Sequence, residues 1–160
     1  MPKFSVISTQ RLATCKPKLR EVMEEAMKTL PDGMDFIVLE GVRSRTQMMT
    51  NYGKGRTAAQ LAAKGIPASF ANPKANRVTW LKDPFASSHA ADPKDGLSRA
   101  VDISPFPIDW NDSEGFNKLG KHVLATAKRL KIPLRWGRDW NMNGRYEEKG
   151  ETDGPHFELV

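Results

Sequence analysis

Two amphipathic helices far apart in the chain constrain the fold of this 160-residue sequence most strongly. Apolar side chains recur every three or four residues over 17–30 and again over 113–131, which predicts one buried face on each helix. Four short segments have the length, composition and bounding turns of strands: 36–39, 100–103, 134–136 and 156–159. The elements do not alternate as in βαβ units. The sequence therefore predicts an α+β fold, a small antiparallel sheet with flanking helices.

Shorter elements fill the rest of the chain. Residues 43–49 and 57–64 predict two short helices, and 66–99 is a polar, proline-rich stretch with one predicted strand at 78–80. Residue Ser113 is the predicted N-cap of the second long helix. No internal repeat or low-complexity linker interrupts the chain. We therefore expect a single domain over residues 1–160, a length that buries roughly 70% of the unfolded surface.

The composition favours an acidic partner. Lys and Arg number 25 against 19 Asp and Glu, which gives a net charge of +6, and the basic residues are spread along the chain without a run of five. Nucleic acid, an anionic membrane surface or an anionic cell-wall polymer would each suit this charge. No apolar run is long enough to insert into a membrane, and the N-terminus lacks the apolar core of a secretory signal. These features predict a protein that stays in the cytosol unless something releases it.

Only four side chains could bind a metal ion through a thiolate or an imidazole: one cysteine and three histidines. The single cysteine, Cys15, excludes an internal disulfide and predicts a small packed side chain near a helix start. His122 falls on the side of its helix away from the apolar stripe, which predicts a solvated face. His89 and His156 lie near strand ends, and Asp102 interrupts a short apolar strand, where a carboxylate needs a partner. Two imidazoles and one carboxylate, with water in the fourth position, form a known catalytic zinc arrangement.

Five short motifs follow one another in a fixed order. They are Glu40-Gly41-Val42-Arg43-Ser44 with Gln47, Ser87-Ser88-His89, Ala100-Val101-Asp102-Ile103, Trp136-Gly137-Arg138-Asp139-Trp140 and Asp153-Gly154-Pro155-His156. In these motifs and in their order, the sequence resembles the family of zinc D-Ala-D-Ala carboxypeptidases and L-alanyl-D-glutamate endopeptidases, which includes phage endolysins. The resemblance extends over residues 15–160.

Two departures from the family pattern leave alternatives open. Twelve residues separate His89 from Asp102 where the family has six, and the extra stretch supplies two rival carboxylates, Asp92 and Asp95. The acid before the last histidine is Asp153, as in the phage endopeptidases, where the carboxypeptidases carry Glu. Glu151 is the alternative base, although its spacing does not match.

The resemblance implies a function and a role for each residue. His89, Asp102 and His156 would hold Zn²⁺, and Asp153 would be the general base. Arg43 would pair with a substrate carboxylate or hold its carbonyl, and Ser87 would bind substrate or orient the site. The implied activity is cleavage of peptidoglycan stem peptides, at the L-alanyl-D-glutamate bond, by a monomeric phage endolysin released from the host cytoplasm to the cell wall.

Three other functions remain as alternatives at this point. The same fold could carry a D-Ala-D-Ala carboxypeptidase. The net charge of +6 alone would suit a nucleic-acid-binding module, but the tryptophans Trp80, Trp136 and Trp140 are expected in the core or lining a pocket rather than as stacking platforms. A glycan hydrolase with two carboxylates would release reducing sugar ends and would not respond to chelators.

Overall fold

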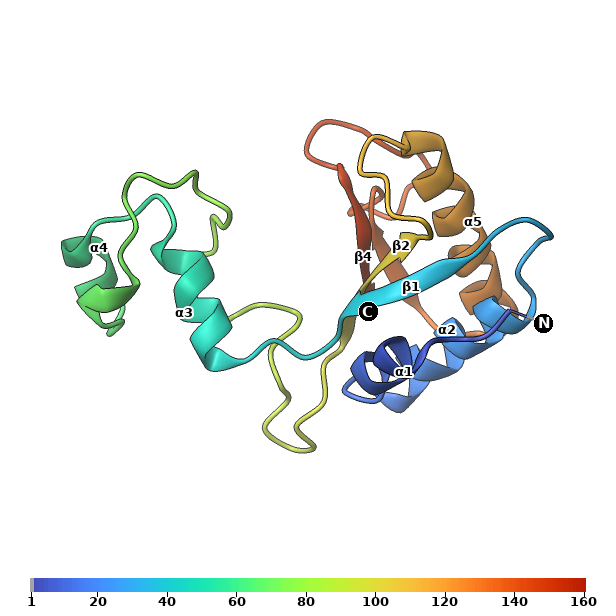
Figure 1. The fold of residues 1–160 in the computed structure, drawn as a ribbon, viewed down its shortest axis with the longest axis horizontal. Helices are drawn as coiled ribbons and strands as arrows, with labels where there is room; N and C mark the ends of the chain where they lie inside the picture. The colour runs from blue at the N-terminus through green and yellow to red at the C-terminus, as the bar shows by residue number, and fades with distance from the viewer. Residues whose placement is uncertain (1) are drawn as a thin grey trace.

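The computed structural model describes residues 2–160 and has a four-stranded antiparallel sheet at its centre. The strands lie in the order β1-β2-β4-β3, and Figure 1 labels the first three of them. Their bounds are β1 (Phe36–Glu40), β2 (Ala100–Pro105), β4 (Asp153–Leu159) and β3 (Leu134–Gly137). The helix α5 (Ser113–Arg129) packs on three of these strands and on α2 (Pro17–Lys28), while α1 (Val6–Leu12) packs on β1. The predicted α+β fold with a small antiparallel sheet is confirmed.

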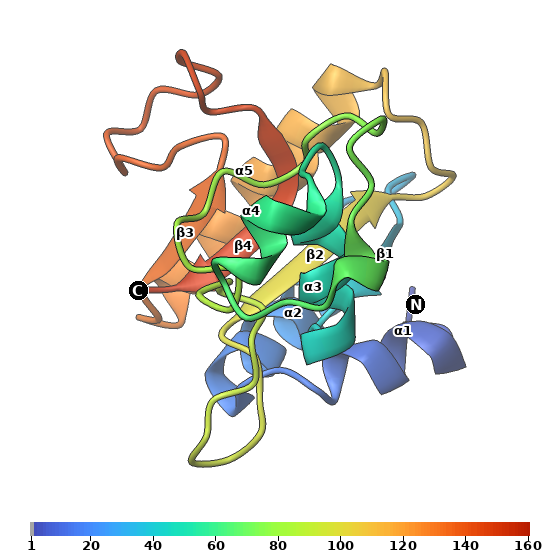
Figure 2. The same cartoon turned by 90° about the vertical axis from the view of Figure 1, so that its left-hand side faces the viewer.

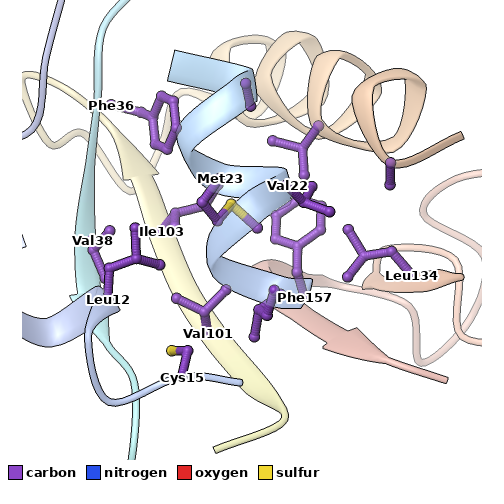
Figure 3. Packing of buried hydrophobic residues seen from close by; sticks show 14 of the residues in the cluster. Leu12, Cys15, Val22, Met23, Phe36, Val38, Val101, Ile103, Leu134 and Phe157 are labelled. Atoms are coloured by element: carbon purple, nitrogen blue, oxygen red, sulfur yellow. The ribbon is translucent and has the colours of Figure 1, made fainter. Parts of the chain in front are cut away.

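The main core lies between the sheet and the two long helices (Figure 3). The apolar face of α2 buries Leu19, Val22 and Met23 completely. Because successive strand residues point to opposite faces, Val101 and Ile103 of β2 turn into this core and Asp102 between them turns away from it. Burial of this kind stabilises the fold by roughly 1.5–3 kcal/mol for each large apolar side chain. The same alternation leaves the other sheet face free for polar residues.

A small lobe stands apart from the sheet. It comprises residues 45–82, with α3 (Arg45–Gly53), α4 (Ala58–Ala62) and the 3₁₀ turn η1 (Ala68–Phe70), and we call it the α3–α4 lobe. The side chains of Ser44 and Thr57 cap the first turns of α3 and α4. The lobe projects away from the sheet in Figure 1 and lies in front of it in Figure 2. Its interior is a separate cluster of three buried residues: Tyr52, Leu61 and Ile66.

Several local predictions were wrong. The N-cap of α5 is Asp112, one residue before the predicted Ser113, because its carboxylate accepts a hydrogen bond from the Gly115 N–H at 2.9 Å. Residues 78–80 form no strand, and Trp80 is 74% exposed rather than buried. The helix α1 was not predicted. Its start at the Ser5 N-cap is the sequence signal that could have revealed it.

His122 and Cys15 have structural positions. His122 is half-buried rather than solvated, and its Nε2 lies 2.8 Å from the carbonyl oxygen of Ala26, which connects α5 to α2. The polar contact therefore replaces the solvated face expected from helical spacing. Cys15 is fully buried, as predicted, and this burial raises the pKa of its thiol to about 11. A thiol held protonated in this way is a packing residue and a poor nucleophile. Across residues 2–160, no helix is long and apolar enough to cross a membrane.

Candidate metal centre

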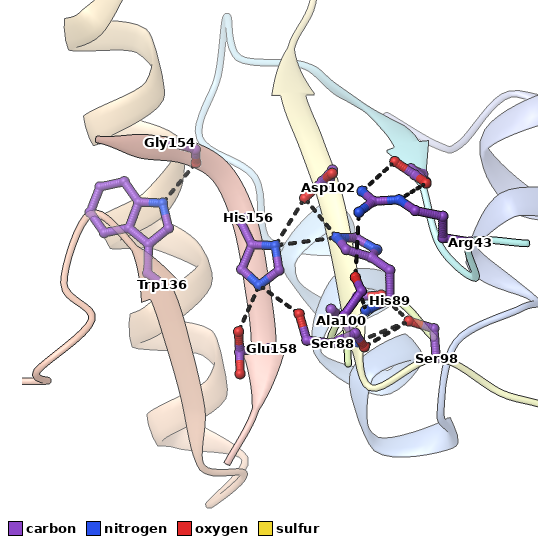
Figure 4. Close-up of polar contacts among 12 residues, drawn as sticks. Arg43, Ser88, His89, Ser98, Ala100, Asp102, Trp136, Gly154, His156 and Glu158 are labelled. Atoms are coloured by element: carbon purple, nitrogen blue, oxygen red, sulfur yellow. Dashed lines mark hydrogen bonds and ion pairs between the residues drawn. The ribbon is translucent and has the colours of Figure 1, made fainter. Parts of the chain in front are cut away.

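Three predicted ligands converge on the polar face of the sheet (Figure 4). Asp102 on β2 and His156 on β4 are directly paired across the antiparallel ladder, and His89 reaches them from the segment before β2. The distances from His89 Nε2 to His156 Nδ1, from His89 Nε2 to Asp102 Oδ1 and from His156 Nδ1 to Asp102 Oδ1 are each 3.2 Å. Both histidines are buried. These two nitrogen atoms and one oxygen atom, the candidate metal-binding atoms, therefore form an equilateral triangle.

This triangle fits a tetrahedral metal ion. Ligand atoms at about 2.0–2.1 Å from a tetrahedral Zn²⁺ lie roughly 3.3 Å from one another, close to the observed separations. Two imidazole nitrogens and one carboxylate oxygen are also a donor set that zinc accepts, and three protein ligands leave the fourth position open. The group could hold a metal ion of this size and geometry.

The second nitrogen of each imidazole has its own acceptor. His89 Nδ1 donates to the carbonyl oxygen of Gly41 at 2.8 Å, and His156 Nε2 donates to Glu158 Oε1 at 2.8 Å. Each acceptor selects the tautomer whose remaining nitrogen presents a lone pair to the centre of the triangle. Hydrogen bonds of this kind orient metal-binding histidines and raise their basicity.

Glu158 is a residue of the candidate site that the sequence did not single out. It lies two residues after His156, so both side chains project from the same face of β4, and this spacing was the available signal. Glu158 is buried, and its Oε2 accepts from Arg99 Nη1 at 2.8 Å and from Arg135 Nη2 at 3.0 Å. Burial alone would raise the pKa of Glu158, but hydrogen bonds from His156, Arg135 and Arg99 outweigh it and lower the pKa to about 2. Glu158 is therefore a firmly held carboxylate behind His156.

In the metal-free protein His156 carries an extra proton at neutral pH. Burial opposes both charged forms, yet the hydrogen bonds between the partners dominate. They hold the pKa of Asp102 well below its ordinary value and raise the pKa of His156 to about 9, with Glu158 contributing to the latter. A metal ion binding to His156 Nδ1 must displace this proton, so metal affinity depends on pH.

Asp153 lies at the start of β4, beside the triad. It lines the same pocket as the three ligands, and the structure begins β4 there rather than at the predicted residue 156. The surrounding protein desolvates the carboxyl group, and together with the nearby charge of Asp102 this raises its pKa, while His156, His89 and Arg43 act in the opposite direction. Asp153 keeps a solvent-exposed surface, so it can exchange protons with water as well as with a bound molecule.

Arg43 and Ser87 form the neighbouring wall of the pocket. The guanidinium group of Arg43 makes a bidentate ion pair with Glu40, with Nε at 2.8 Å and Nη2 at 3.0 Å from its two oxygens. This ion pair uses the Nε and Nη2 edge of the guanidinium group. The remaining nitrogen, Nη1, does not contact Glu40 and lies 3.4 Å from Ser87 Oγ. Glu40 therefore fixes Arg43 in place while one donor still faces the pocket.

The pocket has a volume of about 360 Å³ and is open to solvent. Trp140 lines it, with its ring centroid 5.2 Å from that of His156, whereas Trp136 is fully buried in the core. These two tryptophans confirm the prediction of pocket lining or core. Ser88 also reaches His156, with its Oγ 3.4 Å from Nε2.

The rival carboxylates lie elsewhere. Asp92 and Asp95 belong to the extra stretch between His89 and Asp102. Both form ion pairs with Lys16, at 2.7 Å and 2.6 Å. Glu151 is buried, accepts from the backbone N–H of Asn141 and does not line the pocket. The structure thus brings Asp102, and neither Asp92 nor Asp95, to the two histidines.

The sequence and the fold are similar to those of known L-alanyl-D-glutamate peptidases. The family model described as phage L-alanyl-D-glutamate peptidase matches residues 68–160. The L-alanyl-D-glutamate peptidase of Escherichia phage T5 is 34% identical over 99% of this chain and 98% of its own length. The crystal structure of the L-Ala D-Glu endopeptidase ChiX from Serratia marcescens superposes with a TM-score of 0.59, covering 98% of this chain and 89% of that one. At 21% identity this last match establishes the shared fold. On the first two matches, this chain belongs to the phage L-alanyl-D-glutamate peptidase family.

Proposed function

We propose that this protein is a zinc-dependent endopeptidase that cleaves the L-alanyl-D-glutamate bond of bacterial peptidoglycan. The observation that carries the proposal is the 3.2 Å triangle of His89, Asp102 and His156 in an open pocket beside Asp153. Membership of the phage L-alanyl-D-glutamate peptidase family supports the choice of bond.

Each pocket residue has a task in amide hydrolysis. A zinc ion bound by the triad would polarise the substrate carbonyl and lower the pKa of water toward about 7. Asp153 accepts the proton of the attacking water and returns it to the leaving amine. Its raised pKa suits the second task, because a more basic carboxylate holds the proton until the amine takes it. Arg43 Nη1 and Ser87 Oγ bind the carbonyl or a carboxylate of the stem peptide.

Membership of the phage L-alanyl-D-glutamate peptidase family supports a biological role. We infer that the protein acts as a monomeric phage endolysin, is held in the host cytoplasm until release to the cell wall, and has peptidoglycan rather than nucleic acid as its partner.

Mass spectrometry of digested peptidoglycan tests the activity and the bond together. New L-alanine carboxyl and D-glutamate amino ends are expected, and a chelator should abolish their appearance. Release of free D-alanine would instead identify a carboxypeptidase, and new reducing sugar ends with chelator present would identify a glycan hydrolase.

Two substitutions separate metal binding from proton transfer. His156→Ala should lose both bound zinc and activity, because it removes one of three ligands. Asp153→Ala should keep stoichiometric zinc and lose turnover by about 10²–10⁴-fold, the contribution of a positioned general base. Zinc content by atomic absorption and initial rates on a soluble stem peptide give both quantities. Loss of zinc in Asp153→Ala would show that Asp153 is a ligand and not the base.

A further inference from the structure

The positive charge of this protein is concentrated in the α3–α4 lobe. Residues 45–82 contain seven Lys and Arg and no Asp or Glu, whereas the rest of the chain has 18 Lys and Arg against 19 Asp and Glu. The net charge of +6 is therefore a lobe of +7 attached to a body of −1. Lys and Arg are spread evenly along the chain, and the concentration arises because acidic residues are missing from this one segment.

Most of these cations have no structural task within the lobe. Two of them are exceptions. Arg56 is buried, stacks on the Tyr52 ring at 3.9 Å and donates to the carbonyl oxygens of Tyr52 and Thr79, and the guanidinium group of Arg45 lies 3.8 Å from the centre of the Phe85 ring. Four others are exposed: Lys64, Lys74, Arg77 and Lys82. Four solvated cations on one small lobe repel one another, and no acid of the lobe offsets this repulsion. An anionic partner would offset this electrostatic repulsion.

The lobe is next to the candidate active site. Leu81 at its end, and Ala86 and Ser87 just beyond it, line the same pocket as the three ligands. Val78, Trp80 and Leu81 are 51%, 74% and 41% exposed between the cations Arg77 and Lys82. A polymer with one segment in the pocket would therefore continue onto a surface that combines positive charge with exposed apolar side chains.

We propose that the α3–α4 lobe is a binding surface for the anionic peptidoglycan network around the bond that is cleaved. This inference rests on the proposed function, because the polymer it names is the proposed substrate. The lobe cations pair with carboxylates of neighbouring stem peptides, and the exposed Val78-Thr79-Trp80-Leu81 segment covers apolar faces of the glycan or peptide. A wall polymer fits better than nucleic acid or a lipid surface, because only a substrate polymer must occupy the pocket and the adjoining lobe at the same time.

Two matched variants test the proposal. Lys64, Lys74, Arg77 and Lys82 are replaced by Gln in the lobe variant, and Lys3, Lys94, Lys131 and Lys149, all exposed on the body, are replaced by Gln in the control. Both variants lose four positive charges. Co-sedimentation with intact purified sacculi at low salt should weaken by at least about tenfold in the lobe variant and by less than about twofold in the control. Added salt should weaken wild-type binding to the level of the lobe variant. A charge-preserving variant with Arg at the three lobe lysines should bind like wild type.

Hydrolysis of a short soluble stem peptide separates this proposal from the proposed function. The lobe variant should cleave the soluble peptide with unchanged kcat and KM, and only its KM on intact sacculi should rise. Equal loss of sacculus binding in both variants would overturn the lobe as a distinct surface. The proposal would also be overturned if the lobe variant bound sacculi as well as the wild type does but bound duplex DNA or anionic lipid vesicles more weakly. A wild-type protein that binds sacculi but leaves the soluble peptide intact would overturn the proposed function and leave the lobe surface standing.

Discussion

At the residue scale, one buried carboxylate, Glu158, lies behind the candidate ligand His156. Glu158 accepts from His156 Nε2 and is held by Arg99 and Arg135, so the orientation of the imidazole depends on three residues that contribute no atom to the triangle itself. His89 is oriented differently, by a backbone carbonyl of Gly41 that no side-chain substitution can remove. The two histidines should therefore respond differently to mutation around them.

Replacing Glu158 should weaken metal binding without removing a ligand. Glu158→Ala leaves the Nε2 hydrogen of His156 without its acceptor and leaves Arg99 and Arg135 without their shared partner. A loss of about 10–100-fold in zinc affinity is expected, measured by competition with a chromogenic chelator. Glu158→Gln keeps an acceptor oxygen, so its loss of zinc affinity should be smaller than that of Glu158→Ala. The exposed Glu24→Ala on α2 is the control, and an unchanged zinc affinity in Glu158→Ala would refute this role.

At the element scale, the contact between α5 and the sheet depends on a glycine. A Cβ atom at Gly120 would overlap the Trp136 ring, which is fully buried. The ring cannot easily retreat, because its Nε1 donates to the carbonyl oxygen of Gly154 at 2.8 Å and it stacks on Phe157. The close approach of helix and strand thus requires the missing side chain.

Gly120→Ala should therefore destabilise the protein although alanine favours a helix. The helix gains about 1 kcal/mol from the substitution. Because three atoms of the Trp136 ring would overlap the new Cβ atom, overpacking should cost roughly 2–3 kcal/mol, the upper part of the usual range. A net loss of roughly 1–2 kcal/mol is expected in urea unfolding. Lys128→Ala, exposed on the same helix, should change the free energy of unfolding by less than about 0.5 kcal/mol. An increase in stability for Gly120→Ala would mean that the Trp136 ring moves freely.

At the scale of the whole molecule, the fold joins a nearly neutral body that carries the site to a strongly basic lobe beside it. The body contributes all three candidate ligands and the proposed base, Asp153, while the lobe contributes Leu81 to the pocket. Ion pairs and hydrogen bonds around the ligands also make the stability of the whole protein depend on pH and on metal.

The metal-free protein should be most stable between about pH 4.5 and 6.5. The pKa of Glu158 is lowered from 4.5 to about 2, so its contribution is complete above pH 4.5 and is lost as the pH falls toward 2. The pKa of His156 is raised from 6.5 to about 9, so its contribution is complete below pH 6.5 and is lost as the pH rises through 9. Urea unfolding in chelator should show an alkaline decline of roughly 1–3 kcal/mol.

Metal loading is the control for this pH profile. Zinc takes the place of the proton on His156, so the alkaline decline should disappear in the loaded protein. His156→Ala without metal should also lack it. A metal-free wild type whose stability rises between pH 6.5 and 9 would contradict the assignment.

Local patterns in the sequence determined most of the elements and singled out the candidate ligands. Helical spacing located α2 and α5, and the apolar runs located the strands, because each reflects one buried face. The ordered motifs singled out His89, Asp102 and His156, which the structure brings together. The missing strand at 78–80 and the exposed Trp80 show where an apolar run without a sheet partner misleads.

Only the tertiary structure decided which polar groups meet. Asp92 and Asp95 lie closer in sequence to His89 than Asp102 does, yet Lys16 holds them, and the β2–β4 register places Asp102 opposite His156. The role of Glu158 depends on Arg99 and Arg135 from two other parts of the chain. Side-chain periodicity reports burial along one element, whereas ligand geometry and charge partners depend on contacts between distant segments, which a single sequence does not encode locally.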